Sequence, residues 1–65
     1  MIEIKVLIVE DDPFIAIDIE QILNNLNFRV SGTAYNPEDA LLSLKNNTPD
    51  IVLLDVNLDK IGRAH

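Results

Sequence analysis

The sequence contains no cysteine. This absence excludes disulfide bonds, thiolate metal sites and cysteine nucleophiles, and it is compatible with a reducing cytoplasm. Basic residues are also few, with five lysines and arginines against eleven aspartates and glutamates and a formal net charge of −6. A chain this acidic lacks the positive surface that phosphate backbones and anionic lipids require, so we expect no direct binding to nucleic acid or membrane.

Long apolar segments are missing as well. No run is long enough to span a bilayer, and the chain reaches an acidic cluster at Glu10 before a signal-peptide core develops, so we expect a cytoplasmic protein. The composition is nevertheless globular, because 48% of the 65 residues are hydrophobic. This length predicts one small domain over residues 1–65 and is short for a complete enzyme.

Three apolar segments have the pattern of strands. The first, residues 2–9, alternates at its start and is then continuously apolar, and the second, residues 28–34, alternates apolar with polar side chains. The third, residues 51–54, is uniformly apolar and predicts a buried parallel strand. There are no internal repeats, linkers or low-complexity tracts.

Two helices are predicted between these strands. Asp12-Pro13 and Asn36-Pro37 are both typical helix starts, since the first side chain can cap free amides and proline tolerates the first helical turn. The first helix should run to about residue 26, and its expected apolar stripe is Ile15, Ile19, Ile22, Leu23 and Leu26. The second helix has acidic residues in its first turn and should break at residues 48–50; its expected stripe is Ala40, Leu41 and Leu44.

This order of elements predicts a parallel sheet with crossover helices. If the second and third strands flank the first, right-handed crossovers place the helices on opposite faces. Ligands of such sheets bind at the carboxyl ends of the strands, here between the first and third. Asp11 and Asp12 follow the first strand and Asp55 follows the third, so we expect these carboxylates to converge.

Converging carboxylates favour a bound cation. Like charges resist ionisation together unless a cation compensates them, and a hard ion such as Mg²⁺ or Mn²⁺ takes carboxylate, carbonyl and phosphate oxygens as ligands. A carboxylate can also attack phosphorus to give an aspartyl phosphate. The simpler alternative for Asp12 is a helix cap. Asp55 is different, because a charged residue that directly closes an apolar strand is seldom needed for folding.

Two motifs carry a family resemblance. Val6-Leu7-Ile8-Val9-Glu10-Asp11-Asp12-Pro13, followed at a receiver-like distance by Pro49-Asp50-Ile51-Val52-Leu53-Leu54-Asp55-Val56-Asn57-Leu58, resembles the two opening motifs of response-regulator receiver domains of two-component signalling. The resemblance covers residues 1 to about 59. It implies an α/β fold, a flavodoxin-like doubly wound parallel sheet, here truncated to three strands in the order second, first, third.

The resemblance also implies site residues and partners. Asp55 would accept a phosphoryl group from a histidine kinase, a phosphotransfer protein or a small phosphodonor. Asp11 and Asp12 would be the acidic pair that holds magnesium with Asp55, and Asn57 would supply its backbone carbonyl to the same ion. The chain would therefore be a signalling module rather than an enzyme. Full-length relatives would carry an output domain, and the start of this sequence resembles regulators whose output domain is of the LytTR type.

The sequence also departs from the family. Receivers continue with two further strands that end in a Ser or Thr and in a Lys, both of which touch the phosphoryl group, and the sequence given stops before them. We therefore expect a module that does not complete the switch, and we assign no site role to Lys60 or to His65. The third strand should be an open edge through which copies of the chain associate.

Two alternatives belong to other functional classes. Phosphohydrolases of the haloacid-dehalogenase type also use a strand-end Asp with magnesium, but they carry a second Asp two residues after the nucleophile, where this sequence has Asn57. Their nucleophile also usually closes the first strand. The other alternative is a receiver-like interaction module that binds partners without phosphorylation, and formation of phosphoaspartate at Asp55 separates it from the first hypothesis.

Overall fold

The computed structural model describes residues 3–54 and contains five elements in the predicted order. Strand β1 spans Lys5–Val9, helix α1 spans Pro13–Asn25 and strand β2 spans Arg29–Ala34. Helix α2 spans Pro37–Asn46 and strand β3 spans Ile51–Leu54. The predicted α/β order of strands and helices is therefore confirmed for this part of the chain.

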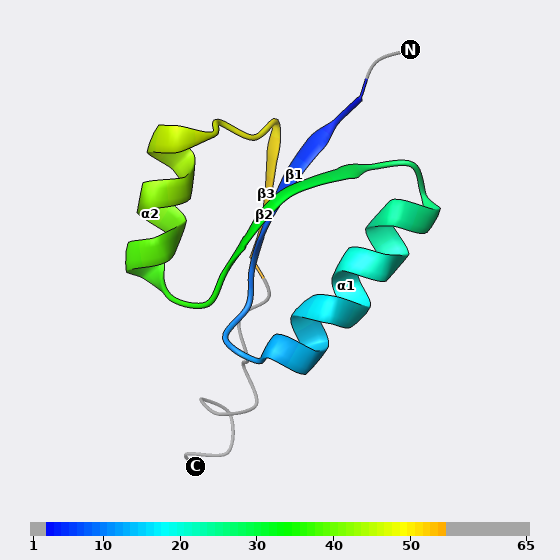
Figure 1. Cartoon of the computed structure of the whole chain (residues 1–65), viewed down its shortest axis with the longest axis horizontal. Coiled ribbons are helices and arrows are strands. Elements are labelled where there is room, and N and C mark those ends of the chain that lie inside the picture. The colour runs from blue at the N-terminus through cyan, green and yellow to red at the C-terminus, as the bar shows by residue number, and fades with distance from the viewer. Residues whose placement is uncertain (1–2, 55–65) are drawn as a thin grey trace.

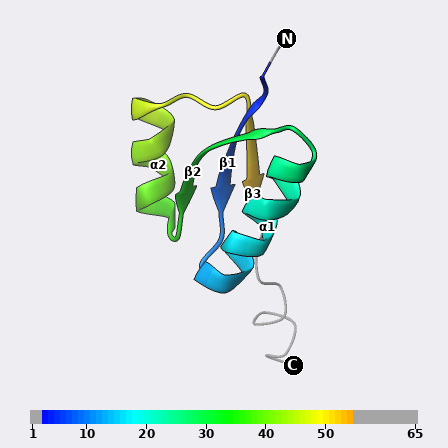
Figure 2. The same ribbon diagram turned by 45° about the vertical axis from the view of Figure 1, so that its right-hand side comes forward.

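The strands form one parallel sheet with β1 in the centre. The order is β2-β1-β3, and both neighbours pair with β1 in parallel. Figure 2 shows the three arrows pointing the same way, with β1 between the other two. Val9 is in register with Ala34 on one side and Leu54 on the other. The carboxyl ends of all three strands therefore meet at one edge, as the sequence predicts.

The two helices cover opposite faces of the sheet. Figure 1 looks along the sheet, with α1 on one side of the overlapping strands and α2 on the other. The chain moves from β1 outward to β2 and then back across β1 to β3, so two right-handed crossovers must place their helices on different faces. Both helices pack against β1 and β2.

Helix α1 is closed by a side chain at its start and by backbone geometry at its end. Asp12 is the N-cap, and Pro13 occupies the first turn. At the other end Asn27 has a φ of 69°, its N–H donates to the Asn24 carbonyl at 3.1 Å, and the Phe28 N–H donates to the Leu23 carbonyl at 2.9 Å. This is the Schellman arrangement, which satisfies the last carbonyls and turns the chain toward β2.

Helix α2 has a reciprocal cap. The Asn36 Oδ1 atom accepts the N–H of Asp39 at 2.8 Å, and the Asn36 Nδ2 atom donates to the Asp39 carboxylate at 3.2 Å. Glu38 and Asp39 lie in the first turn and Lys45 in the last, where each charge suits the helix dipole. The Asn36-Pro37 helix start is therefore confirmed.

The core is small and is centred on β1. Val6, Leu7 and Ile8 are at most 2% exposed, and Ala16 of α1 and Ala34 of β2 are equally buried. Because β1 is covered by a helix on each face and by a strand on each side, apolar side chains on both of its faces are buried.

The expected apolar stripes of the helices are only partly correct. On α1, Ala16 is the buried residue and Ile19 and Leu23 are half-buried, whereas Ile15, Ile22 and Leu26 are exposed. On α2, Ala40 is half-buried while Leu41 and Leu44 are exposed. Within residues 3–54 each helix packs on β1 and β2 alone, and two strands cover only part of an apolar helix face.

A bulge interrupts the alternation of β2. Val6 is paired with Val30 but Leu7 is paired with Gly32, so Ser31 is the extra residue. The Ser31 hydroxyl donates to the Val6 carbonyl at 3.4 Å, and the Asn47 amide donates to the Ser31 carbonyl at 3.3 Å. The loop after α2 therefore supplies a hydrogen bond to a backbone carbonyl of the bulge, where the pairing between β1 and β2 is interrupted.

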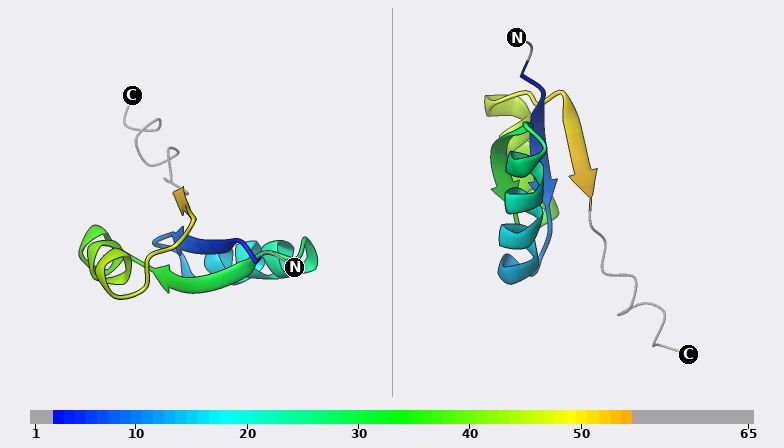
Figure 3. Two further views of the ribbon diagram at one scale, coloured as in Figure 1. Left: turned by 90° about the horizontal axis from the view of Figure 1, so that it is seen from above. Right: turned by 90° about the vertical axis from the view of Figure 1, so that its right-hand side faces the viewer.

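Strand β3 is present and parallel, but the prediction that it is buried was wrong. Ile51, Val52, Leu53 and Leu54 are 45%, 40%, 37% and 62% exposed. Figure 3 shows β3 standing clear of both helices. Because α1 and α2 cover β1 and β2, neither face of β3 is covered within residues 3–54. The prediction that β3 is an open edge agrees with this arrangement.

Candidate functional site

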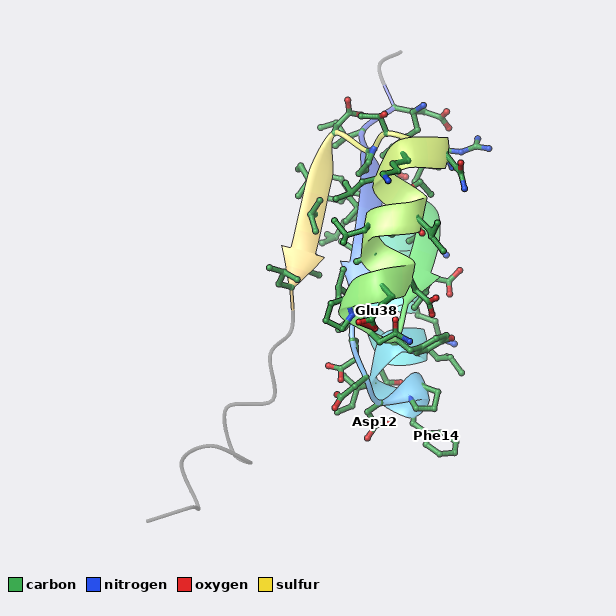
Figure 4. The ribbon with its side chains drawn as sticks, turned by 90° about the vertical axis from the view of Figure 1, so that its left-hand side faces the viewer. Asp12, Phe14 and Glu38 are labelled. Atoms are coloured by element: carbon green, nitrogen blue, oxygen red, sulfur yellow. The ribbon has the colours of Figure 1, made fainter. Side chains whose placement is uncertain are left out.

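The candidate site lies at the carboxyl edge of the sheet, immediately after β1. The three residues that follow Val9 are Glu10, Asp11 and Asp12. They lie at the end of β1 beside β3, where the winding direction of the chain reverses, which is the position at which open α/β sheets bind their ligands. Figure 4 shows Asp12 at this end of the molecule, with Glu38 from the start of α2 at the same end.

Asp12 caps helix α1. Its backbone is extended, with φ −96° and ψ 113°, and its Oδ1 atom accepts the N–H of Phe14 at 2.9 Å and that of Ile15 at 3.4 Å. These amides have no partner within the helix, so the carboxylate satisfies donors that would otherwise depend on water. The capping interpretation of Asp12 is confirmed. Its predicted role as a metal ligand stays a prediction.

Asp11 is the exposed member of the acidic cluster. It sits between the buried Glu10 and Asp12, the residue that caps α1. Of the two aspartates that the sequence nominates, Asp11 is therefore the one that solvent can reach and that does not hold the start of the helix.

Glu10 is the residue that the sequence analysis missed. It is only 2% exposed, its Oε2 atom accepts the N–H of Asp12 at 2.8 Å, and its own N–H donates to the Ala34 carbonyl at 2.9 Å. A carboxylate is rarely buried unless hydrogen bonds or a cation compensate it. The signal was available, because Glu10 closes an apolar strand just as Asp55 does.

Asp55 and Asn57 lie outside the described residues, as do Lys60 and His65. The structure fixes what precedes them. Leu54 is the last residue of β3 and is in register with Val9, so the next residues along the two neighbouring strands are Asp55 and Glu10. Within residues 3–54, no group of three or more acidic or histidine side chains could hold a metal ion.

A cavity of about 240 Å³ lies at the opposite end of the sheet, at the amino ends of β1 and β2. Its surroundings are polar and include an ion pair in which Arg29 approaches Glu3 at 3.6 Å. It is lined by Glu3, Lys5, Arg29, Val30, Ser31 and Asn47. None of the candidate site residues contributes to it.

Comparison with known proteins gives one family. The family model of the response regulator receiver domain matches residues 6–62. The chemotaxis protein CheY of Thermotoga maritima is 32% identical over 58 residues, which are 89% of this chain and 48% of that protein. The sensory transduction protein LytR of Staphylococcus haemolyticus is 40% identical over 55 residues, which are 83% of this chain and 22% of that protein.

A solved structure agrees with these matches. The response regulator PhyR from Brucella abortus superimposes with a TM-score of 0.78 and 28% sequence identity, covering 97% of this chain and 29% of that one. A protein-glutamate methylesterase/protein-glutamine glutaminase of Syntrophus aciditrophicus is 41% identical over 59 residues, but these are only 17% of its length. The chain thus spans less than half of each of these relatives.

The fold and the position of the acidic cluster define a doubly wound α/β signalling module. The chain belongs to the response regulator receiver domain family of two-component signalling. This confirms the resemblance carried by the two motifs, and it decides against a haloacid-dehalogenase-type phosphohydrolase. Within residues 3–54, neither helix has the length and apolar character needed to cross a membrane.

Proposed function

We propose that this chain is a phosphoacceptor module and that Asp55 receives a phosphoryl group from a histidine kinase, a phosphotransfer protein or a small phosphodonor. One observation carries the proposal. The acidic residues after β1 stand at the strand end that is in register with Leu54, the last residue of β3, and Asp55 is the next residue in the sequence. The proposed setting is the cytoplasm, where such donors are found.

The transfer would proceed by nucleophilic attack. A carboxylate oxygen of Asp55 forms a bond to phosphorus while the bond from phosphorus to the donor nitrogen, or to the donor oxygen of an acyl phosphate, breaks and its electron pair leaves with the donor. No atom is oxidised or reduced. The acidic residues beside the acceptor raise the cost of bringing in a phosphoryl group unless positive charge is present.

The donor chemistry of this edge fits a hard divalent cation, Mg²⁺ or Mn²⁺. When bound, such an ion neutralises negative charge on the phosphoryl oxygens. We propose that Asp11 and Asp55 supply carboxylate oxygens and Asn57 its backbone carbonyl. Asp12 is the remaining candidate from the sequence. Glu10 directly follows Val9, which is in register with Leu54, so its position after β1 matches that of Asp55 after β3, and we therefore propose Glu10 beside Asp11 as the second acid at the ion.

Three further expectations do not follow from membership of the family alone. The longer relatives pair a receiver with further segments, so a conformational relay to an output domain, LytTR-type or other, is proposed only for a longer parent protein. The expectation that the 65-residue chain accepts a phosphoryl group without completing the switch stays a prediction. Self-association through the β3 edge also stays a prediction.

The test is phosphorylation of the 65-residue chain. The protein is incubated with acetyl phosphate and Mg²⁺ and examined by intact mass spectrometry, beside Asp55→Asn, Asp11→Asn and the matched control Asp18→Asn, whose aspartate is exposed on α1. We expect one phosphoryl group on the parent and on the control, none on Asp55→Asn, and much less on Asp11→Asn.

Two results would contradict the proposal. Modification of Asp55→Asn to the same extent as the parent would place the phosphoryl group elsewhere. A parent chain that stays unmodified with acetyl phosphate, and that also shows no fluorine resonance of bound beryllofluoride, would favour the interaction module that works without phosphorylation.

A further inference from the structure

Two of the few cations in this chain lie side by side at the cavity beside the amino ends of β1 and β2. Lys5 is the first residue of β1 and Arg29 the first of β2, and both line the cavity. They are register partners in the parallel pair, so their side chains lie on the same face of the sheet. Like charges at paired positions of a sheet are destabilising. Folding alone therefore does not explain why both positions are basic.

The positive charge of the described residues is gathered at this end of the molecule. The remaining lysine or arginine in residues 3–54 is Lys45, in the last turn of α2. Figure 2 shows that α2 ends at the end of the sheet from which β1 and β2 start. The formal charge of the whole chain is −6, and the acidic residues 10–12 lie at the opposite, carboxyl edge. A local group of cations in an otherwise acidic chain attracts anions to one place.

The acidic groups near the cavity neutralise these two cations only in part. Arg29 approaches Glu3 at 3.6 Å, but both side chains are 63% exposed, and a pair so exposed contributes little. The Lys5 ammonium group has no ion pair within residues 3–54. The Asp50 carboxylate instead accepts the backbone N–H of Lys5 at 2.8 Å. Two cations and one acid line the cavity, so its lining has a net positive formal charge.

Hydrogen-bond donors of the lining suit a phosphate group. The Arg29 guanidinium offers a planar fork that matches two phosphate oxygens, and the Lys5 ammonium is a compact charge that also binds phosphate. The side-chain amide of Asn47 has two N–H groups, and its nitrogen donates to the Ser31 carbonyl at 3.3 Å, which leaves a second N–H for a ligand. The cavity volume of about 240 Å³ is below the roughly 300–1,000 Å³ of pockets for drug-sized ligands, so the ligand should be small.

We propose that this cavity binds a small phosphate-type anion, inorganic phosphate or a small phosphate monoester, between the side chains of Lys5 and Arg29. The anion accepts hydrogen bonds from both cations and from Asn47, and it offsets the repulsion between the neighbouring positive charges. The lining residues belong to the start of the chain, to β1, to β2 and to the loop after α2, and none belongs to β3. Binding is non-covalent and does not depend on phosphorylation of Asp55, so this proposal and the proposed function can fail separately.

Titration with inorganic phosphate, followed by nuclear magnetic resonance of the backbone amides, tests the proposal. The 65-residue chain is titrated without Mg²⁺ and at an ionic strength held constant with sodium chloride, so that general screening does not change. We expect saturating shifts at the lining residues with a Kd on the order of 1 mM, the affinity that a few charge-assisted hydrogen bonds supply. A parallel titration with methyl phosphate separates the two ligand sources, because the better ligand of the two binds with the lower Kd.

Variants with the same change of charge locate the site. Lys5→Gln and Arg29→Gln each remove one proposed ligand, and the control Lys45→Gln removes the same charge from a lysine that does not line the cavity. We expect the Kd to rise roughly tenfold or more for the first two variants and to stay within about twofold for the control. Glu3→Gln removes the acid that competes for Arg29, so it should lower the Kd by a factor of about two to five.

Unfolding in urea gives a second readout that does not depend on a charge-removing variant. An anion that binds only the folded chain stabilises it, so phosphate should stabilise the parent more than Arg29→Lys, which keeps the charge and loses the planar fork. Three results would each overturn the proposal: no saturating shifts at the lining residues, shifts centred instead on the carboxyl edge of the sheet, or a loss of binding in Lys45→Gln as large as in Arg29→Gln.

Discussion

Replacing Asp12 by alanine removes the acceptor of two amides at the start of α1. The Phe14 N–H loses a hydrogen bond of 2.9 Å, whereas the bond from Ile15 is longer, at 3.4 Å, and contributes less. Loss of an N-cap costs about 1 kcal/mol, and loss of a negative charge at a helix N-terminus adds about 0.3–1 kcal/mol. We therefore expect Asp12→Ala to lower the free energy of unfolding by about 1–2 kcal/mol.

Asparagine separates the cap from the charge. Asp12→Asn keeps a side-chain oxygen for the two amides, and asparagine is a good N-cap, so we expect it to lose only the charge contribution of about 0.3–1 kcal/mol. In a domain of this size, 1 kcal/mol corresponds to about 4–8 °C in Tm. Asp12→Ala should thus melt several degrees below Asp12→Asn.

Urea and thermal unfolding followed by circular dichroism measure both differences, and titration with Mg²⁺ adds a second readout. If Asp12 serves mainly as the cap, Asp12→Asn binds Mg²⁺ much as the parent does while Asp11→Asn binds it more weakly. Equal destabilisation by alanine and asparagine would refute the capping argument. Loss of Mg²⁺ binding in Asp12→Asn would instead restore the role that the sequence assigns to this residue.

Two further substitutions test the backbone. Asn27 has a φ of 69°, a conformation that favours glycine. Asn27→Gly should therefore raise the free energy of unfolding by about 0.5 kcal/mol, and Asn27→Val should lower it by about 1–2 kcal/mol. Unchanged melting of both variants would contradict the Schellman assignment. At Gly32 an added Cβ would meet Leu7 Cδ1 at 3.8 Å, an ordinary contact, and no glycine in the described residues has a positive φ. Gly32→Ala should therefore raise the free energy of unfolding, measured in urea, by about 0.4–1 kcal/mol. A clear loss of stability would show that the bulge needs the glycine.

The helices, the strands and their order could be predicted because short local sequence signals mark them. Asp12-Pro13 and Asn36-Pro37 mark helix starts by chemistry that acts over three residues, and both caps are present in the structure. The strand order with β1 in the centre is what the family resemblance implies, and given that order the handedness of the two crossovers places the helices on opposite faces. Neither inference needs to know which side chains finally touch.

Burial could not be predicted in the same way, because it depends on what covers each element. The apolar run of β1 and that of β3 have the same pattern in the sequence, yet Ile8 is 0% exposed and Leu54 is 62% exposed. The difference is positional, since β1 lies between two strands and two helices, whereas within residues 3–54 only β1 lies beside β3. The expected stripes of α1 and α2 were only partly correct for the same reason, because within residues 3–54 each helix packs on β1 and β2 alone.

Glu10 is a charged residue that closes an apolar strand, as Asp55 is. The sequence nominates Asp55 because it is a charged residue that closes an apolar strand, and the same description fits Glu10. The adjacent pair Asp11 and Asp12 is typical of metal ligands, although the second of them caps a helix. Burial separates these roles: the buried Glu10 accepts the Asp12 N–H, Asp12 holds the helix, and Asp11 faces solvent. The three adjacent acids are therefore not equivalent, and substitutions at each should have different effects on folding and on cation binding.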